Sequence, residues 1–199
     1  MTERARWINL DSMARVPYRT SGDTDGEVSQ LLRRLEERGS NLNVLRALAN
    51  ADGSFRNFMR LLNSLLERSK LDPRWRELAI MRVAWRNGAD YEWGQHVAFA
   101  RRAGLTDDEI EAVKDWTGSD ALGPRDKAVL RFTDEVEDRR LTDEAWNTVA
   151  EFLDDAELVE LTVSGGFWSM VGRFMLAVQI EREPGTPGFD DWRKAAGGS

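Results

Sequence analysis

Cysteine is absent from the 199 residues of this sequence. Its absence excludes disulfides, thiolate nucleophiles, redox pairs and thiolate metal ligands together. His96 is the only histidine, so a metal site with two histidines is excluded as well. A Ser-His-Asp triad would have to use His96, and no Gly-x-Ser-x-Gly segment supplies its serine. The available chemistry is therefore mostly that of carboxylates, one imidazole, tyrosine and arginine.

Basic clusters and long apolar runs are also missing. The formal charge is −7 and no one-sided Lys/Arg cluster stands out, which argues against a nucleic-acid partner. No uninterrupted apolar run reaches about 18 residues, so we expect no membrane-spanning helix and no membrane partner. The first residues lack the apolar core of a signal peptide, which favours the cytoplasm. With 41% hydrophobic and 32% charged residues, the chain is expected to fold as a globular protein.

Apolar residues recur at helical spacing along most of the chain. Asp72-Pro73 reads as a helix cap followed by proline at the first helical position, and Thr106 with Glu109 reads as a capping box. Nothing reads as a strand, so the predicted fold class is all-α. The expected helices span residues 26–38, 44–48, 54–68, 73–87, 89–103, 106–116, 124–136, 142–153 and 155–182, the last apolar on nearly every side and therefore central.

Three segments organise the chain. We expect an N-terminal arm at 1–25, one helical domain at 26–182 and a tail at 183–199. The arm would dock through Trp7, Ile8 and Leu10, and the tail through Phe189 and Trp192. A weak internal repeat aligns 71–85 with 153–168 after a one-residue shift, which suggests two packed helical hairpins.

Residues 76–96 hold the candidate site. They are predicted to form a helix, a break at Asn87-Gly88 and a second helix. On the second helix, Glu92 and His96 lie one turn apart within an apolar arc, and Glu77 lies among apolar residues on the first. A buried charge without a partner costs several kcal/mol, roughly, so these side chains should meet one another or a ligand.

These residues resemble a known family. The spacing Glu77, eleven residues, Ala89, two residues, Glu92, three residues, His96 is similar to that of the AhpD-like and carboxymuconolactone decarboxylase family. Further similar segments, which bring the resemblance to roughly residues 25–182, lie at 76–85, 91–97, 124–130, 160–161 and 171–174.

The resemblance implies an AhpD-like helical bundle that forms a homo-oligomer, commonly a trimer or hexamer, with sites near subunit contacts. In the thiol peroxidase branch, the positions of Ala89 and Glu92 hold a Cys-x-x-Cys pair. Without sulfur at either position the disulfide peroxidase cycle is excluded. The decarboxylase-type members need no metal or organic cofactor, so none is expected here.

The site residues suit proton transfer next to a carbonyl. His96 is the candidate general acid/base, Glu92 its partner one turn away, and Glu77 a supporting carboxylate. The substrate would be a small carboxylated or carbonyl compound. The same groups can serve decarboxylation, isomerisation, hydrolysis, dehydration or cyclisation, so the residues leave the reaction open.

Further residues are candidates for substrate binding. Tyr91 can donate a hydrogen bond to a substrate oxygen. Arg173 can clamp a substrate carboxylate, although Glu160 or Glu77 would be an equally good partner for it. Pocket walls are expected from Trp85, Trp93 and Trp168.

Three hypotheses for the function of the site remain. The first is a cofactor-free lyase or isomerase. The second is a non-catalytic oligomeric binding or structural protein, because a Glu-His pair four residues apart is often only a helix-surface contact. The third is a metal-assisted enzyme using Glu77, Glu92 and His96, which the resemblance disfavours.

Overall fold

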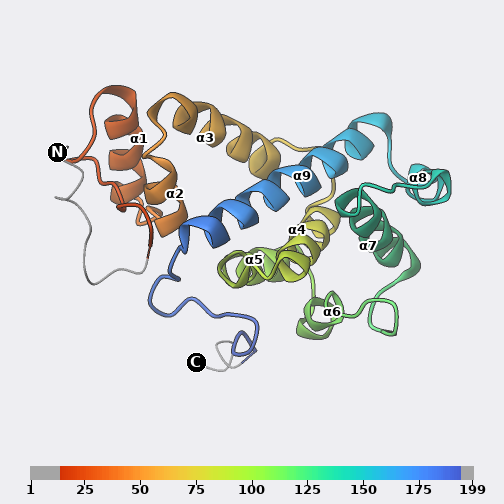
Figure 1. The fold of residues 1–199 in the computed structure, drawn as a ribbon. Coiled ribbons are helices and arrows are strands. Elements are labelled where there is room, and N and C mark those ends of the chain that lie inside the picture. The colour runs from red at the N-terminus through yellow and green to blue at the C-terminus, as the bar shows by residue number, and fades with distance from the viewer. Residues whose placement is uncertain (1–13, 194–199) are drawn as a thin grey trace. The chain divides into compact units, whose positions relative to one another are not determined.

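The computed structural model describes residues 14–193, and every regular element in that range is helical (Figure 1). The all-α prediction is confirmed. In chain order the helices are α1 Gly26–Glu37, α2 Asn43–Leu48, α3 Asp52–Glu67, α4 Pro73–Asn87, α5 Asp90–Arg102, α6 Asp107–Ala112, α7 Pro124–Glu137, α8 Asp143–Ala150 and α9 Asp155–Val178. The expected anchors Trp7, Ile8 and Leu10 lie outside the described residues.

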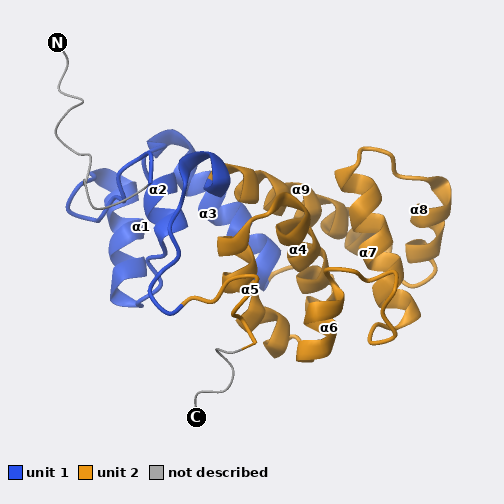
Figure 2. Cartoon of the chain, turned by 60° about the horizontal axis from the view of Figure 1, so that its bottom comes forward, with its two compact units in different colours: residues 1–67, 175–185 blue, residues 68–174, 186–199 orange. Residues whose placement is uncertain are grey.

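The chain forms two compact units, shown in different colours in Figure 2. The smaller unit contains α1, α2, α3 and residues 175–185. Within it Leu32 and Phe55 are buried, and the Glu183 carboxylate accepts a hydrogen bond from the backbone N–H of Asn43 at 2.6 Å. That contact satisfies a backbone donor at the start of α2, where the helix offers no partner of its own.

The larger unit, residues 68–174 and 186–193, carries the candidate site. Its central helix is α4, which packs against both α5 and α7. One face of α4 places Leu78 and Met81 in a core with Trp93 of α5, and another face places Ala79 in a core with Phe132 of α7. Because α4 is buried on both faces, its side chains are held in fixed positions.

The turn between α4 and α5 follows from its sequence. The Asp72 carboxylate caps α4 by accepting from the N–H of Arg74 at 2.8 Å. The helix ends at Gly88, whose φ of 67° lies in the left-handed region that glycine adopts without strain. Ala89 then bonds back to the carbonyl of Ala84 at 2.9 Å, and α5 begins at Asp90.

Several boundaries differ from the sequence prediction. The Thr106 capping box forms as expected, but α6 ends at Ala112 rather than near Trp116. The last helix ends at Val178 because Gln179 adopts a φ of 59°. The matching part of the weak repeat is thus one unbroken helix, without the turn found at Gly88.

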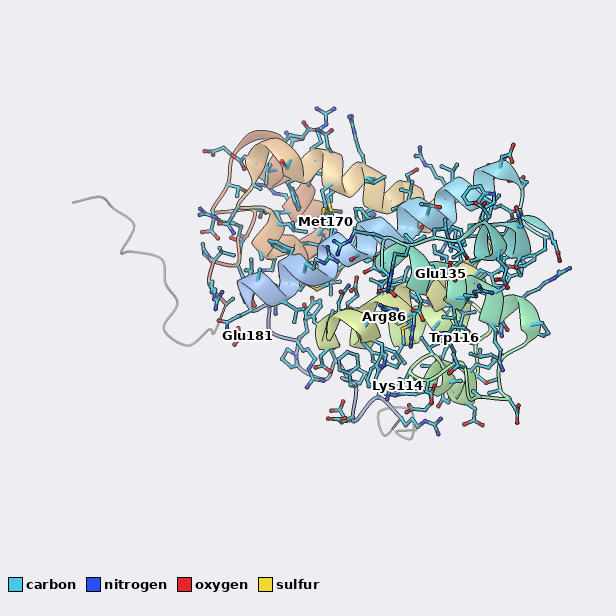
Figure 3. The ribbon with its side chains drawn as sticks, turned by 45° about the vertical axis from the view of Figure 1, so that its right-hand side comes forward. Arg86, Lys114, Trp116, Glu135, Met170 and Glu181 are labelled. Atoms are coloured by element: carbon cyan, nitrogen blue, oxygen red, sulfur yellow. The ribbon has the colours of Figure 1, made fainter. Side chains whose placement is uncertain are left out.

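Helix α9 is not buried on every side. Its exposed apolar residues are Val159, Val163, Met170 and Leu176, of which Met170 is labelled in Figure 3. By length and composition α9 could cross a membrane, unlike the other helices within residues 14–193, although half of the relevant segment is buried inside the protein. A core helix satisfies the same criterion, so this feature alone does not place the protein in a membrane.

The C-terminal segment packs closely on α5. Trp192 is 1% exposed and Phe189 contacts the same core, so both expected anchors are in place. A Cβ atom at Gly94 would collide with the backbone carbonyl of Pro187. Glycine at position 94 is therefore what allows this close backbone approach.

Candidate active site

The α4–α5 pair buries the three ionisable side chains singled out in the sequence. Glu77 on α4 is fully buried, and Glu92 and His96 on α5 are 1% and 4% exposed. The two α5 residues lie one turn apart, as their spacing requires.

Glu77 is the partner of His96. Its Oε2 lies 2.8 Å from Nδ1 of His96, and its Oε1 accepts from Nε of the buried Arg76 at 3.2 Å. Because a carboxylate oxygen accepts, this geometry places the imidazole proton on Nδ1. In the neutral ring Nε2 is then the free base.

The expected contact between Glu92 and His96 is wrong. Neither carboxylate oxygen of Glu92 has a hydrogen-bond partner within the described part of the chain. The spacing of four residues puts both side chains on one side of α5, but they turn to different neighbours. His96 reaches α4, whereas Glu92 lies against α9, where a Cβ at Gly172 would come within 2.8 Å of Oε2.

Glu92 is surrounded in a way that disfavours its charge. Burial raises its pKa well above 4.5, and the nearby carboxylate of Glu137 on α7 raises it further. Glu137 itself accepts from Oγ of Ser169 at 2.8 Å and lies 3.9 Å from the guanidinium of Arg173. Asn87 extends this chain of contacts, because its Nδ2 lies 3.4 Å from the Ser169 hydroxyl.

Trp168 stands beside the imidazole. Its ring meets that of His96 edge-on with 4.5 Å between ring centres, and its buried Nε1 has no hydrogen-bond partner among residues 14–193. Trp168 and Gly172 are one turn apart on α9 and contact His96 and Glu92, which are one turn apart on α5. Within the described residues, α5 and α9 thus hold unpaired buried polar side chains: Glu92 and Trp168 beside the Glu77–His96 pair, and also Trp93 and Ser164.

The other tryptophans lie elsewhere. Trp93 is fully buried and packs against Trp85 at 6.0 Å and Trp192 at 6.3 Å. Lys114, labelled in Figure 3, lies over the rings of Trp85 and Trp93. The structure thus groups Trp85 and Trp93 with the C-terminal segment. Tyr91 is buried on α5.

Arg173 takes neither of the protein partners expected for it. Its side chain is 62% exposed and its ion-pair partner is Glu137. Glu160 instead accepts from the Ser69 hydroxyl at 2.6 Å and from the backbone N–H of Leu71 at 2.9 Å. These contacts fix the segment that leads into α4.

Three neighbours of the site were missed in the sequence: Arg76, Glu137 and Gly172. Glu137 could have been found, because it follows the buried Thr133 by four residues and Leu130 by seven, and so continues the inner face of α7. Gly172 has no comparable signal, because its role depends on which helix faces α9.

The side chains of the site are poorly arranged to bind a metal ion. Across residues 14–193, no three side chains of histidine, aspartate or glutamate gather closely enough to hold one. Both oxygens of Glu77 are already engaged by Arg76 and His96. A surface depression exists on the larger unit, but the site residues do not line it; its lining is Glu111, Lys114, Phe189, Asp190, Trp192 and Arg193.

Comparison with known proteins agrees with this geometry. Residues 53–135, which include Glu77, Glu92 and His96, match the model of the carboxymuconolactone decarboxylase family. The uncharacterized protein YdfG of Bacillus subtilis (strain 168) is 28% identical over 100 residues, which cover 49% of this chain and 68% of YdfG.

Solved structures share the fold. A peroxidase-related protein from Ralstonia eutropha JMP134, described as an alkylhydroperoxidase AhpD core, superposes with a TM-score of 0.75 at 18% identity, covering 87% of this chain and 94% of its own. The debrominase Bmp8, as a cysteine-to-alanine variant in complex with 2,3,4-tribromopyrrole, gives 0.69 at 16% identity, covering 94% and 97%. Residues 53–135 are thus similar to the carboxymuconolactone decarboxylase family, and the fold is that of AhpD-like structures, in a chain without cysteine.

Proposed function

We propose that this protein is a cofactor-free enzyme that moves a proton on a small carboxylated or carbonyl compound, with His96 as the general acid/base. The observation that carries the proposal is the buried 2.8 Å contact between Nδ1 of His96 and Glu77. Glu77 fixes the orientation of the ring and supports the imidazolium that forms when Nε2 takes up a proton.

Two related reactions fit this arrangement. In a decarboxylation, His96 first takes a proton from solvent on Nε2 and becomes an imidazolium. The C–C bond to the carboxylate then breaks, carbon dioxide leaves, and the bonding electrons remain as an enolate, whose carbon takes the Nε2 proton and returns the ring to its neutral form. In an isomerisation, Nε2 takes a proton from one carbon and returns it to another. Both reactions balance without an added oxidant or reductant, and neither uses a thiol.

One relative supports a small substrate, and the absence of cysteine argues against one mechanism. Bmp8 is a debrominase whose cysteine variant was captured with tribromopyrrole, a small ring compound. Since this chain has no cysteine, a thiol-dependent debromination or peroxidase cycle is closed to it. We propose that this chain shares the fold of Bmp8 and uses His96, instead of a cysteine, as its reactive group.

Activity and fold must be tested separately. We expect His96→Gln to lower turnover of a screened lactone or keto acid by about 10²–10⁴-fold, with an unchanged far-UV CD spectrum. The matched control is Ala98→Gln, which puts the same side chain on the exposed side of α5. Absence of turnover in the wild type across the screen, with His96→Gln merely less stable, would favour a non-catalytic binding protein.

The tautomer can be measured without a substrate. In tag-free protein the ring ¹⁵N signals arise from His96 alone. We expect a protonated Nδ1 and an unprotonated Nε2 in the neutral ring, and a change in this pattern in Glu77→Gln. A neutral ring protonated on Nε2 would remove the basis of the proposal.

We further propose a homo-oligomer, such as a trimer or hexamer. The exposed stripe Val159, Val163 and Met170 on α9 supports association between copies. Sedimentation of the wild type and of Val163→Glu is the test, and a monomeric wild type would refute it.

A further inference from the structure

Glu92 is the buried ionisable group that the Glu77–His96 pair leaves unused. We propose that Glu92 is a neutral carboxylic acid that donates a hydrogen bond to a carbonyl-type oxygen of a ligand held beside Nε2 of His96. The identity of the ligand rests on the proposed function, whereas the protonation of Glu92 can be tested without it.

Space for the carboxyl group comes from α9. A Cβ at position 172 would lie 2.8 Å from Oε2 of Glu92 and 3.2 Å from the Cβ of Ala89, so glycine is needed there for Glu92 to keep this position. Trp168, one turn earlier on α9, contacts His96. Glu92 and His96 are therefore placed along one line of contact with the same helix.

The neutral form follows from burial and from the neighbouring charges. Glu92 is 1% exposed and neither oxygen has a partner in the described residues, so an anion there would lack both water and a counter-ion. Of the charged groups around the site, Glu137 on α7 acts on Glu92; His96 lies on α5, the Arg76–Glu77 pair on α4 and Arg173 on α9. Arg76 is bound to Glu77 and Arg173 is paired with Glu137.

Glu137 has hydrogen-bond and ion-pair partners near the site. It receives the hydroxyl of Ser169 and lies near Arg173, contacts that Glu92 lacks. When two carboxyl groups interact and only one is supported by donors, the unsupported group keeps its proton. We therefore assign the protonated form to Glu92.

A protonated Glu92 donates a hydrogen bond, so the ligand atom facing it must be a hydrogen-bond acceptor. The Glu92 hydroxyl and the buried Nε1 of Trp168, which also lacks a partner in residues 14–193, are both donors. A carbonyl or lactone oxygen accepts from such groups and gains negative charge when the adjacent carbon loses a proton. A donor already in place stabilises that charge without rearrangement.

Infrared spectroscopy tests the protonation state directly. At neutral pH the difference spectrum of wild type minus Glu92→Gln should contain the C=O stretch of a protonated carboxylic acid, and the control Glu151→Gln, at an exposed position, should leave this band in place. In Glu137→Gln the band should disappear at a lower pH than in the wild type. A wild-type spectrum without the band would overturn the assignment, whatever the activity.

Binding tests the role of the donor. The probe is a small unsaturated γ-lactone, which should shift the Glu92 band. We expect Glu92→Gln, whose amide still donates, to bind it within a few-fold of the wild type, and Glu92→Met to lose about tenfold or more in affinity. Equal losses in both variants, or a band that the lactone leaves unmoved, would overturn the ligand role. Failure of the proposed function would instead appear as a band that shifts while His96→Gln leaves turnover unchanged.

Discussion

Two regions of the larger unit treat their buried and partly buried polar groups in opposite ways. Between α4 and α7, Asp134 accepts from Arg82 at 2.6 and 2.9 Å and from Nε1 of Trp116 at 2.9 Å, and it lies 3.1 Å from Arg86. Arg86 and Trp116 are labelled in Figure 3. Between α5 and α9, Glu92 and Trp168 are buried without partners among the described residues.

The contrast separates scaffold from site. Folded proteins pair nearly all buried polar groups, and an unpaired one destabilises the fold unless it serves another purpose. The satisfied network around Asp134 fixes α4, and α4 in turn positions Glu77 against His96. Our proposal is that a ligand completes two of the unsatisfied groups, Glu92 and Trp168.

The largest expected effect comes from removing Glu77, the carboxylate paired with Arg76 and His96. Glu77→Ala leaves the buried Arg76 without its partner and Nδ1 of His96 without its acceptor. Breaking a buried ion pair from one side costs about 3–5 kcal/mol. Chemical denaturation at neutral pH should show this loss of unfolding free energy, and Glu151→Ala on the exposed surface should show almost none. A loss similar to that of the control would mean that the pair does not support the fold.

The next largest loss of stability is expected in the network of Asp134 with Arg82, Arg86 and Trp116. Asp134→Asn removes the charge that holds Arg82 and Arg86, at an expected cost of about 2–3 kcal/mol. Burial acts to raise the pKa of Asp134, but the hydrogen bonds of Arg82 and Trp116 outweigh it and hold the pKa below 3.8. The carboxylate therefore stabilises the fold above that pH, and this contribution is lost as the pH falls through the lowered pKa. Denaturation of both proteins between neutral and acidic pH should show the gap closing, and a gap independent of pH would contradict this account.

The fold was largely predictable because local signals determine it. Asp72-Pro73, Gly88 and the Thr106–Glu109 box set helix ends through their own backbone chemistry, and the structure shows each of them. The end of α9 was missed because Gln179 at positive φ has no such signal. The exposed stripe of α9 was missed because an apolar composition says nothing about which sides of a helix are covered.

The site was predictable only in part. Periodicity placed Glu77, Glu92 and His96 inside the protein, since burial follows from the position on a helix. The pairing within the set could not be read from spacing. Whether His96 meets Glu92 or Glu77 depends on the packing of α4 on α5, and the surroundings of Glu92 depend on Gly172 of α9.

An effect of opposite sign distinguishes Glu92 from Asp134. The pKa of Glu92 is raised by burial and, further, by Glu137. The folded state therefore tolerates the neutral carboxyl group, and ionisation of Glu92 destabilises the fold. Glu92→Gln should therefore match the wild type near or below pH 4.5 and become increasingly more stable above it, by at most about 1.4 kcal/mol per pH unit. Denaturation curves over the same pH series provide the measurement. A variant less stable at high pH would mean that Glu92 is paired as an anion.

The smallest effect is expected at an ion pair that resembles the Asp134 network in number of bonds but lies in solvent. Arg131 donates to Glu135 at 2.9 Å and to both oxygens of Glu144 at 2.8 and 3.0 Å. The side chain of Glu144 is 74% exposed, so water and salt can replace each of these contacts. We expect Arg131→Ala to leave the melting temperature nearly unchanged, whereas Arg82→Ala lowers it clearly. A similar drop in melting temperature in both variants would show that the number of ion pairs, rather than their burial, determines stability here. The distinction between scaffold and site would then need another basis.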